Sequence, residues 1–271
     1  MSNQPDHGDR RKFLFGGAAA ATIALAAGFG YAERERLKDL RRRILDIPPD
    51  YSRAQRNAFY AMAREIRNRQ AKQSREQVAA LKKKYQDPVF GKVRVWDLVE
   101  RLSLCIDPSD DSLLLTSQYH HTQQILEGME KSRITDKNLL LTALLHDTGK
   151  TIMLHGEVPE NVVGYTIPIG EFSQGIGADN LILQFGHGEF MYSRLHGQVP
   201  DEVAWSIRYH STPLDTLRPY LNESDQRYMQ STLSAFSGYD MGMKSVGHLP
   251  HVNMAPYRAM IEDLFPNPIL I

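Results

Sequence analysis

The chain has 271 residues, of which 42% are hydrophobic, 24% are charged and one is a cysteine. Its 32 basic residues are balanced by 32 acidic ones, so it lacks the overall positive charge with which nucleic-acid-binding proteins attract phosphates. The single Cys105 excludes a disulfide bond within the chain. Apart from an N-terminal leader, this length suits one domain.

The first 32 residues resemble a twin-arginine export signal. Arg10 and Arg11 precede Lys12, and the segment from Phe15 to Ala32 carries no charge. Its alanine and glycine content suits a cleaved leader, although residues 13–32 are also long enough to anchor the chain in a membrane. We therefore expect transient contact with the twin-arginine machinery and export to the periplasm, with the leader either removed or kept as an anchor.

Residues 33–92 are expected to form a charged helical extension that packs on the core, residues 93–271. Leu, Ile and Ala recur at helical intervals from Glu33 to Leu45 and from Ala54 to Tyr85, and Pro48 and Pro49 separate these two predicted helices. The basic runs at residues 41–43 and 82–84 are interpreted as solvated helix faces. No Cys/His finger or aromatic-interleaved basic strand accompanies them, so we expect no nucleic-acid partner.

Apolar residues at helical spacing dominate the core and predict an all-α fold. The segment from Val162 to Ile169 is the one candidate strand. The predicted helices run from Val95 to Cys105, Ser117 to Lys131, Asp136 to His146, Asn180 to Leu195, Asp201 to His210, Asp225 to Tyr239 and Pro256 to Leu264.

Six histidines and aspartates form a candidate ligand set for two metal ions on helices. They are His121, His146, Asp147, His187, His210 and Asp240. Adjacent side chains on a helix diverge by about 100°, so His146 and Asp147 meet at one ion only if the carboxylate reaches sideways. A carboxylate can also bridge to a second ion, and helical bundles hold iron or manganese pairs with imidazole and carboxylate ligands. His120, which adjoins His121, is a rival for the first position.

The His146-Asp147 pair, with an earlier histidine and a later aspartate, resembles the HD superfamily of metal-binding helical domains, most of which are phosphohydrolases. Longer stretches resemble the inositol oxygenase family, and they occur in the family's order over roughly residues 70 to 268. These stretches are residues 162–170, 180–192, 206–211 and 237–244.

The resemblance implies an HD-domain-like helical bundle that encloses two irons and uses dioxygen as co-substrate. One iron would be bound by His121, His146, Asp147 and Asp240, and the other by His187, His210 and the bridging Asp147. A match to the family's motif downstream of the first ligand selects His121, whereas a match upstream through Asp107 would select His120. In the family, the reaction oxidises and cleaves myo-inositol to D-glucuronate.

The family's motifs also imply a substrate site and a mode of catalysis. The residues placed beside the polyol are Lys150, Gly164, Tyr165, Ser211 and Lys244. Lys150 and Asp147 are implied to be catalytic, because a lysine near a metal-bound hydroxyl stabilises its deprotonated form. We expect a monomer that acts on myo-inositol or a related small polyol.

Two departures from the family bear on the substrate. The chain reads Gly164-Tyr165 where the family has Gly-Asp, and a tyrosine offers one hydroxyl in place of a carboxylate. Residues 212–215 lack the aromatic side chains that the family places there. Two alternatives stay open: an HD-type phosphohydrolase, in which Lys150 and Lys244 would hold phosphate, and a helical protein that binds metal without catalysis.

Overall fold

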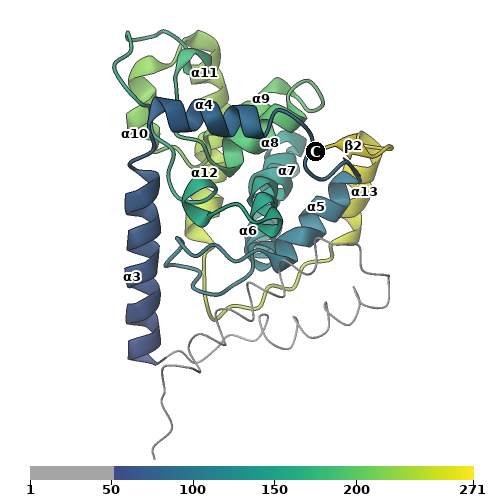
Figure 1. Ribbon diagram of the computed structural model, residues 1–271. Helices are drawn as coiled ribbons and strands as arrows, with labels where there is room; N and C mark the ends of the chain where they lie inside the picture. Colours follow the sequence, from purple (N-terminus) through teal and green to yellow (C-terminus); the bar gives the residue numbers. More distant parts are fainter. Residues whose placement is uncertain (1–51) are drawn as a thin grey trace, which may run out of the picture.

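The computed structural model describes residues 52–271 (Figure 1). The predicted export signal, the predicted anchor at residues 13–32 and the predicted helix from Glu33 to Leu45 lie outside this range. Within residues 52–271, no helix combines the length and the apolar character needed to cross a membrane.

The described part of the chain is mostly helical, which confirms the all-α prediction. The α-helices are α3 (Arg53–Gln70), α4 (Arg75–Lys84), α5 (Val95–Arg101), α6 (Gln118–Lys131), α7 (Lys137–Leu145), α8 (His187–Leu195), α9 (Asp201–Tyr209), α10 (Leu214–Leu217), α11 (Glu223–Tyr228), α12 (Ser234–Gly242) and α13 (Ala255–Leu264). The 3-10 helices are η1 (Leu102–Leu104), η2 (Thr148–His155), η3 (Pro159–Asn161), η4 (Ala178–Asn180) and η5 (Arg218–Tyr220), and the π-helical turn η6 (Met229–Leu233) joins α11 to α12. The short strands β1 (Lys92–Val93) and β2 (Ile269–Leu270) pair antiparallel.

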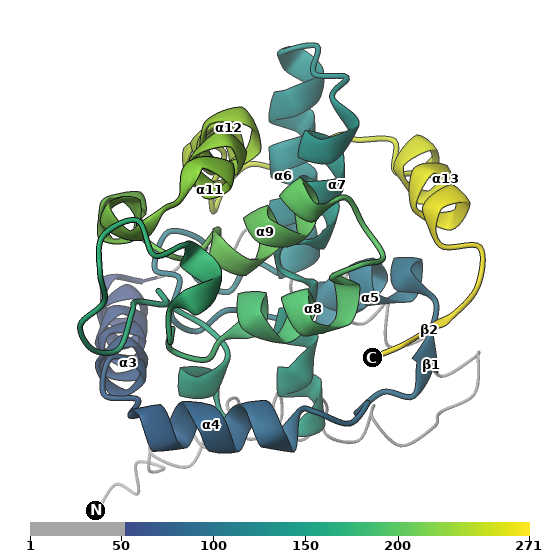
Figure 2. The same cartoon turned by 90° about the horizontal axis from the view of Figure 1, so that it is seen from above.

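The hydrophobic core lies between α6, α7, α8, α9 and α12. Seen from above, α6, α7, α8 and α9 occupy the middle of the molecule, with α4 along one edge (Figure 2). Ile125 of α6, Leu144 of α7, Phe190 of α8, Ile207 of α9 and Phe236 of α12 are fully buried in one continuous cluster. Burying a side chain of this size contributes about 1.5–3 kcal/mol, so these helices are held firmly around the site described below.

The predicted helix from Ala54 to Tyr85 is wrong as a single element, because the chain forms α3 and α4 with a turn between them. Ser74 accepts a hydrogen bond from the amide of Gln77, and the Gln77 side chain accepts one from the amide of Ser74. This reciprocal capping box starts a new helix after α3 has ended. Between Ile66 and Val78 the only apolar residue is Ala71, so the apolar pattern does not mark where one helix ends and the next begins.

The predicted helix from Asn180 to Leu195 is also wrong in its first half, since α8 begins only at His187. Residues 181–185 are extended and pair with the candidate strand: the amide of Ile169 donates to the Ile182 carbonyl (2.7 Å). The strand prediction is itself reduced to one isolated bridge between Pro168 and Leu183. The amide of Gln184 also donates to the Ile167 carbonyl (3.0 Å), so backbone hydrogen bonds flank this bridge on both sides. The remaining predicted helices are present with boundaries shifted by a few residues.

Candidate metal centre

The structure brings all six predicted ligand residues into one buried cluster. Each of the six side chains is at most 12% exposed. His121 lies on α6, His146 and Asp147 follow α7, His187 begins α8, His210 follows α9 and Asp240 lies on α12. Residues up to 119 positions apart in the sequence therefore meet at one point.

The Asp147 carboxylate divides its two oxygens between different histidines. Oδ2 lies 3.2 Å from Nε2 of His146, whereas Oδ1 lies 3.3 Å from Nε2 of His187 and 3.6 Å from Nε2 of His210. A carboxylate with a separate set of nitrogens at each oxygen is the arrangement that could bridge two cations.

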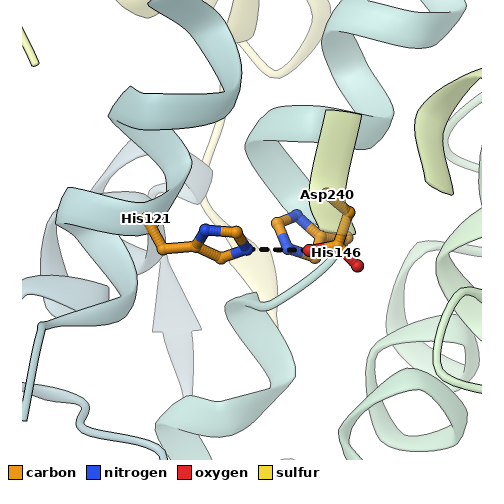
Figure 3. Close-up of side chains that lie close together, drawn as sticks. All are labelled: His121, His146 and Asp240. Carbon is orange, nitrogen blue, oxygen red and sulfur yellow. Dashed lines mark hydrogen bonds and ion pairs between the residues drawn. The ribbon is translucent and has the colours of Figure 1, made fainter. Parts of the chain in front are cut away.

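The ligand atoms form two groups, and within each group all atoms lie within 4.8 Å of one another. His146 belongs to both groups. The first group joins His121, His146 and Asp240 (Figure 3), in which Nε2 of His121 lies 2.8 Å from Oδ1 of Asp240. The second joins His146, Asp147 and His210. Two ions next to each other would suit this pattern better than one.

Backbone carbonyls fix the orientation of three of the imidazole rings. Nδ1 of His146 donates to the Ala143 carbonyl (3.0 Å) and Nδ1 of His210 to the Ile207 carbonyl (2.8 Å), each three residues earlier at the end of a helix. Nδ1 of His187 donates to the Val162 carbonyl (2.6 Å). Since the hydrogen sits on Nδ1, the lone pair of each Nε2 is directed into the cluster, as in histidine ligands of metals.

These lone pairs lack hydrogen-bond donors in the part of the chain that the structure describes. Nε2 of His146 is buried and has no hydrogen-bond partner there. Nε2 of His187 and Nε2 of His210 lie 2.9 Å apart, although each ring already donates from its other nitrogen. Facing lone pairs repel unless a cation lies between or beside them, so the residues fit a metal centre.

The ends of α7 and α9 both favour positive charge in the cluster. His146 and His210 are the C-cap residues of these helices, where unpaired carbonyls carry a partial negative charge of about half an electron. Helix α8, which carries His187, approaches α9 closely because Gly188 has no side chain at the contact. A Cβ atom at Gly188 would lie 2.7 Å from the Arg208 carbonyl oxygen, so any larger residue would push His187 away from His210.

Burial and charge favour the ionisation state that metal ligands require at His121, His210 and Asp147. Burial lowers the pKa of His210 to about 4, although the Asp147 carboxylate opposes that shift, and burial also lowers the pKa of His121. For Asp147, burial is the largest effect and raises the pKa, but His146 and Lys150 together bring it well below its usual range. Metal ligands must be neutral imidazoles and ionised carboxylates.

A cavity of about 410 Å³ opens beside the cluster. Four of the six candidate ligands line it: Asp147, His187, His210 and Asp240. The five residues predicted to contact substrate all line it too: Lys150, Gly164, Tyr165, Ser211 and Lys244. The structure thus brings the predicted ligands and the predicted substrate residues together around one space.

Lys150 is buried against two carboxylates. Its Nζ lies 2.9 Å from Asp107 and 3.0 Å from Asp147, and it donates to Oε1 of Gln118 (2.9 Å). Burial alone would lower the pKa of Lys150, but Asp107 and Asp147 outweigh it and raise the pKa above its usual range. Lys150 is therefore a fixed positive charge at the cavity wall.

Lys244 is held in the same way at the other side of the cluster. Its Nζ donates to Asp110 (2.8 Å) and lies 3.9 Å from Asp240. Asp240 and Asp110 raise the pKa of Lys244 against the opposing effect of burial. Both lysines thus remain charged beside the metal ligands.

Several residues of the cavity were missed in the sequence. Asp107, Ser109 and Asp110 belong to a loop that precedes α6, and Arg67 reaches the cavity from α3. Lys150 was the available signal, because a lysine that is buried within an apolar segment requires a carboxylate partner. Asp107 and Asp110 are the acids that follow the buried segment ending at Cys105.

The structure also shows which of His120 and His121 faces the cluster. Nε2 of His120 lies 2.7 Å from the His248 carbonyl and is turned toward the loop after Lys244. His121 is the neighbour that faces the cluster.

Comparison with known families bears directly on this arrangement. A family model described as "Myo-inositol oxygenase" matches residues 55–175 and 164–271, which is well over half of the chain. The chain belongs to the myo-inositol oxygenase family.

Curated relatives carry names from the myo-inositol oxygenase family. "Probable inositol oxygenase" of Oryza sativa subsp. japonica is 30% identical over 213 residues, which is 64% of this chain and 68% of that protein. "Inositol oxygenase 4" of Arabidopsis thaliana is 31% identical over 212 residues, 64% of this chain and 66% of that protein. "Inositol oxygenase" of Homo sapiens is 27% identical over 213 residues, 65% of this chain and 74% of that protein. The chain thus spans about two thirds of the length of the plant relatives.

The rim of the cavity carries exposed apolar and aromatic side chains. Tyr165 is 53% exposed and Met241 is 54% exposed, and both line the cavity with Pro213 and Leu214. The amide of Thr166 donates to the Ser211 carbonyl (3.1 Å), so Tyr165 lies close to the segment that follows His210. One side of the rim is apolar, while the loop with Asp107 and Asp110 makes another side acidic.

Proposed function

We propose that this protein is an iron-dependent oxygenase that oxidises and cleaves a cyclic polyol, myo-inositol or a close relative, to an open-chain acid with dioxygen as co-substrate. Two irons would be held by His121, His146, Asp147, His187, His210 and Asp240, with Asp147 shared between them. The observation that carries the proposal is the split Asp147 carboxylate, with different histidines at its two oxygens and the Lys150 cation beside it.

Iron would supply the chemistry that side chains lack. When bound, redox-active iron with imidazole and carboxylate ligands provides dioxygen binding and the one-electron steps that attack on an unactivated C–H bond requires. The overall reaction balances as one cyclohexanehexol plus one dioxygen giving one uronic acid plus one water.

The chain's own residues would bind and orient the polyol. Ser211 Oγ is buried and has no hydrogen-bond partner within the described residues, although Ser211 lines the cavity. An unpaired buried hydroxyl costs about 1–3 kcal/mol, and a polyol hydroxyl would remove that cost. Asp107, Asp110 and Ser109 offer further acceptors on the opposite loop. A cavity of this polarity suits a molecule that carries hydroxyls all round its ring.

Lys150 would act through its charge. Because its pKa is raised, it stays protonated at neutral pH and cannot remove a proton from the substrate. A fixed cation near a polyol hydroxyl instead favours the deprotonated form of that hydroxyl. Asp147 would hold the metals and Lys150 together, since its carboxylate contacts both.

The phosphohydrolase alternative has less support from the cavity. Both lysines that would bind phosphate are already paired, Lys150 with Asp107 and Asp147, and Lys244 with Asp110. A phosphate entering the site would meet these carboxylates at close range, and like charges there repel strongly.

Oxygen uptake by iron-loaded protein tests the proposed function. We expect dioxygen consumption with at least one inositol isomer and formation of a uronic acid in equal amount. Phosphate release from phosphoesters without oxygen demand would assign the protein to the hydrolases instead. Turnover of neither class would leave only metal binding.

We further propose that residues 1–32 direct export by the twin-arginine route to the periplasm, and that the exported protein is a monomer. The Arg10-Arg11 pair supports this route because it resembles the pathway's signal. The pathway also carries folded proteins, which suits a metal centre that is loaded before export. Replacing both arginines with lysine should retain the protein in the cytoplasm. Cell fractionation tests this, and unchanged export of the variant would contradict it.

A further inference from the structure

Helix α3 lies across two loops that shape the cavity. It runs along the side of the molecule next to the bundle (Figure 1). Its residues Ala63, Arg67 and Gln70 are spaced at four and three positions, so they share one face of the helix. Ala63 and Gln70 are buried. Arg67 and Gln70 contact residues of the cavity wall, and Ala63 packs against Leu114 beyond it.

Arg67 binds the loop that carries the acidic partners of both lysines. One guanidinium nitrogen donates to the Ser109 carbonyl (3.0 Å) and another to the Asp111 carboxylate (3.0 Å). Asp107 and Asp110, which pair with Lys150 and Lys244, lie in the same loop. The planar guanidinium thus holds a carbonyl and a carboxylate at a fixed separation, which a lysine could not do.

A small hydrophobic cluster fastens the same loop further along. Phe59 and Ala63 of α3 pack against Leu114, with Val246 at the edge. Leu114 has a φ of +52°, in the left-handed region that L side chains rarely adopt, and it is 5% exposed. A strained residue of this kind persists only when its surroundings determine its conformation, and here the packing against α3 does so.

The end of α3 contacts the opposite side of the cavity. The Gln70 carbonyl accepts from Nε2 of Gln184 (3.0 Å). Oε1 of Gln70 lies against Gly164, whose φ is +96°, so a side chain at position 164 would collide with it. One helix therefore touches both the acidic loop and the turn that precedes Tyr165.

We infer that α3 is the positioning element of the substrate cavity and that Arg67 is its principal positioning residue. Arg67 keeps the loop of residues 107–115 in the conformation in which Asp107 and Asp110 meet Lys150 and Lys244. The inference rests on the proposed function for its substrate, but the loop contact itself does not depend on which substrate is bound. Metal ligation is separate, because none of the six proposed ligands contacts Arg67.

The variants Arg67→Ala, Arg67→Lys and Asp111→Asn test the inference, with Arg69→Ala as the matched control. Arg69 lies on the same helix, is half exposed and pairs with Glu65 and Glu160, away from the loop. In oxygen uptake with the polyol substrate, Arg67→Ala should raise KM about tenfold, with kcat within about twofold. Iron content should not change. The KM of Arg67→Lys should fall between those of wild type and Arg67→Ala, because lysine keeps the positive charge but lacks the planar guanidinium that binds two acceptors at once.

A double variant separates positioning from direct substrate contact. If Arg67 acts through Asp111 and the loop, Arg67→Ala combined with Asp111→Asn should be hardly worse than Arg67→Ala alone. Three results would overturn the inference. They are effects of Arg67→Ala and Asp111→Asn that multiply in the double variant, a fall in kcat at constant KM, and an Arg67→Ala variant that behaves like Arg69→Ala.

Amide hydrogen exchange gives a readout that needs no substrate. Residues 107–115 should exchange faster in Arg67→Ala than in wild type, while α7 and α9 keep their protection. If wild type consumes no oxygen with any cyclic polyol, the proposed function fails, yet this exchange measurement still decides the role of Arg67. Equal exchange in the loop of both proteins would refute it.

Discussion

Nε2 of His187 and Nε2 of His210 face each other at 2.9 Å, while a backbone carbonyl occupies the other nitrogen of each ring. Two neutral imidazoles gain nothing from this arrangement, because each presents a lone pair to the other. The folded chain holds them there through α8, α9 and the close contact at Gly188. A cation bound by both rings would turn this repulsion into attraction, which gives the metal proposal its physical basis.

Replacing Asp147 should disturb both metals, whereas replacing Asp240 should disturb one. Asp147→Asn removes the charge and presents an amide hydrogen to a histidine, so metal content should fall from about two ions per chain to well below one. Asp240→Asn should leave about one ion per chain, because Asp240 belongs only to the group with His121 and His146. Elemental analysis of purified protein measures both.

Asp215→Asn serves as the control for these variants, since its side chain is fully exposed. It should retain the metal content of wild type. Equal losses in Asp147→Asn and Asp240→Asn would argue against a carboxylate shared between two sites.

Lys150→Met should abolish most of the activity. The variant removes the cation from the cavity and leaves Asp107 and Asp147 without their buried partner. We expect kcat/KM for the polyol to fall by at least about 100-fold, together with a destabilisation of about 3–5 kcal/mol. Steady-state oxygen uptake measures kcat/KM, and urea unfolding measures the free energy of unfolding. Lys83→Met, at an exposed position on α4, should alter neither.

The metal-free protein should lose stability as the pH falls from about 6.5 to about 4. Burial lowers the pKa of His210 to about 4, below the ordinary value of 6.5. The unfolded chain therefore binds a proton in this window that the folded chain does not, and stability declines as the pH falls. Above about pH 6.5 this contribution is fully present.

The variant His210→Gln should show a shallower decline in the same window. Urea unfolding of both metal-free proteins at pH 7.5, 5.5 and 4.5 measures the difference. Parallel pH profiles for the two proteins would mean that His210 does not carry the effect.

Tyr165→Asp should improve the use of unsubstituted inositol. Tyr165 lines the cavity, at the position where the resemblance in the sequence implies an aspartate in the family. A carboxylate accepts hydrogen bonds from two hydroxyls. One added hydrogen bond contributes about 0.5–1.5 kcal/mol, so kcat/KM should rise roughly three- to tenfold. Tyr165→Phe, which removes only the hydroxyl, is the matched variant.

If the tyrosine ring provides an apolar contact to a substituted substrate, Tyr165→Phe should keep the activity of wild type. A loss of activity in Tyr165→Phe, with no gain in Tyr165→Asp, would show instead that the phenol hydroxyl itself binds the polyol.

The grouping of the six candidate ligands could be predicted from the sequence because buried histidines and aspartates are rare. A histidine and an aspartate at the end of an apolar run, such as His146 and Asp147, need partners when buried. The choice between His120 and His121 depended on a helix rotation of about 100°, which the structure resolves through the contact of His120 with His248.

The loops could not be predicted in the same way. Asp107 and Asp110 lie in a turn with no periodic pattern, and the role of Arg67 depends on how α3 packs against that turn. The start of α8 was misplaced because residues 181–185 are apolar enough for a buried helix or an extended segment. Tertiary pairing with residues 167–169 decides in favour of the extended form.

Metal analysis after anaerobic reconstitution with ferrous iron tests the central claim most directly. About two irons per chain in wild type, reduced to about one in Asp240→Asn and close to none in Asp147→Asn, is the result that the account predicts. A single tightly bound ion in wild type, retained when Asp147 is replaced, would contradict it.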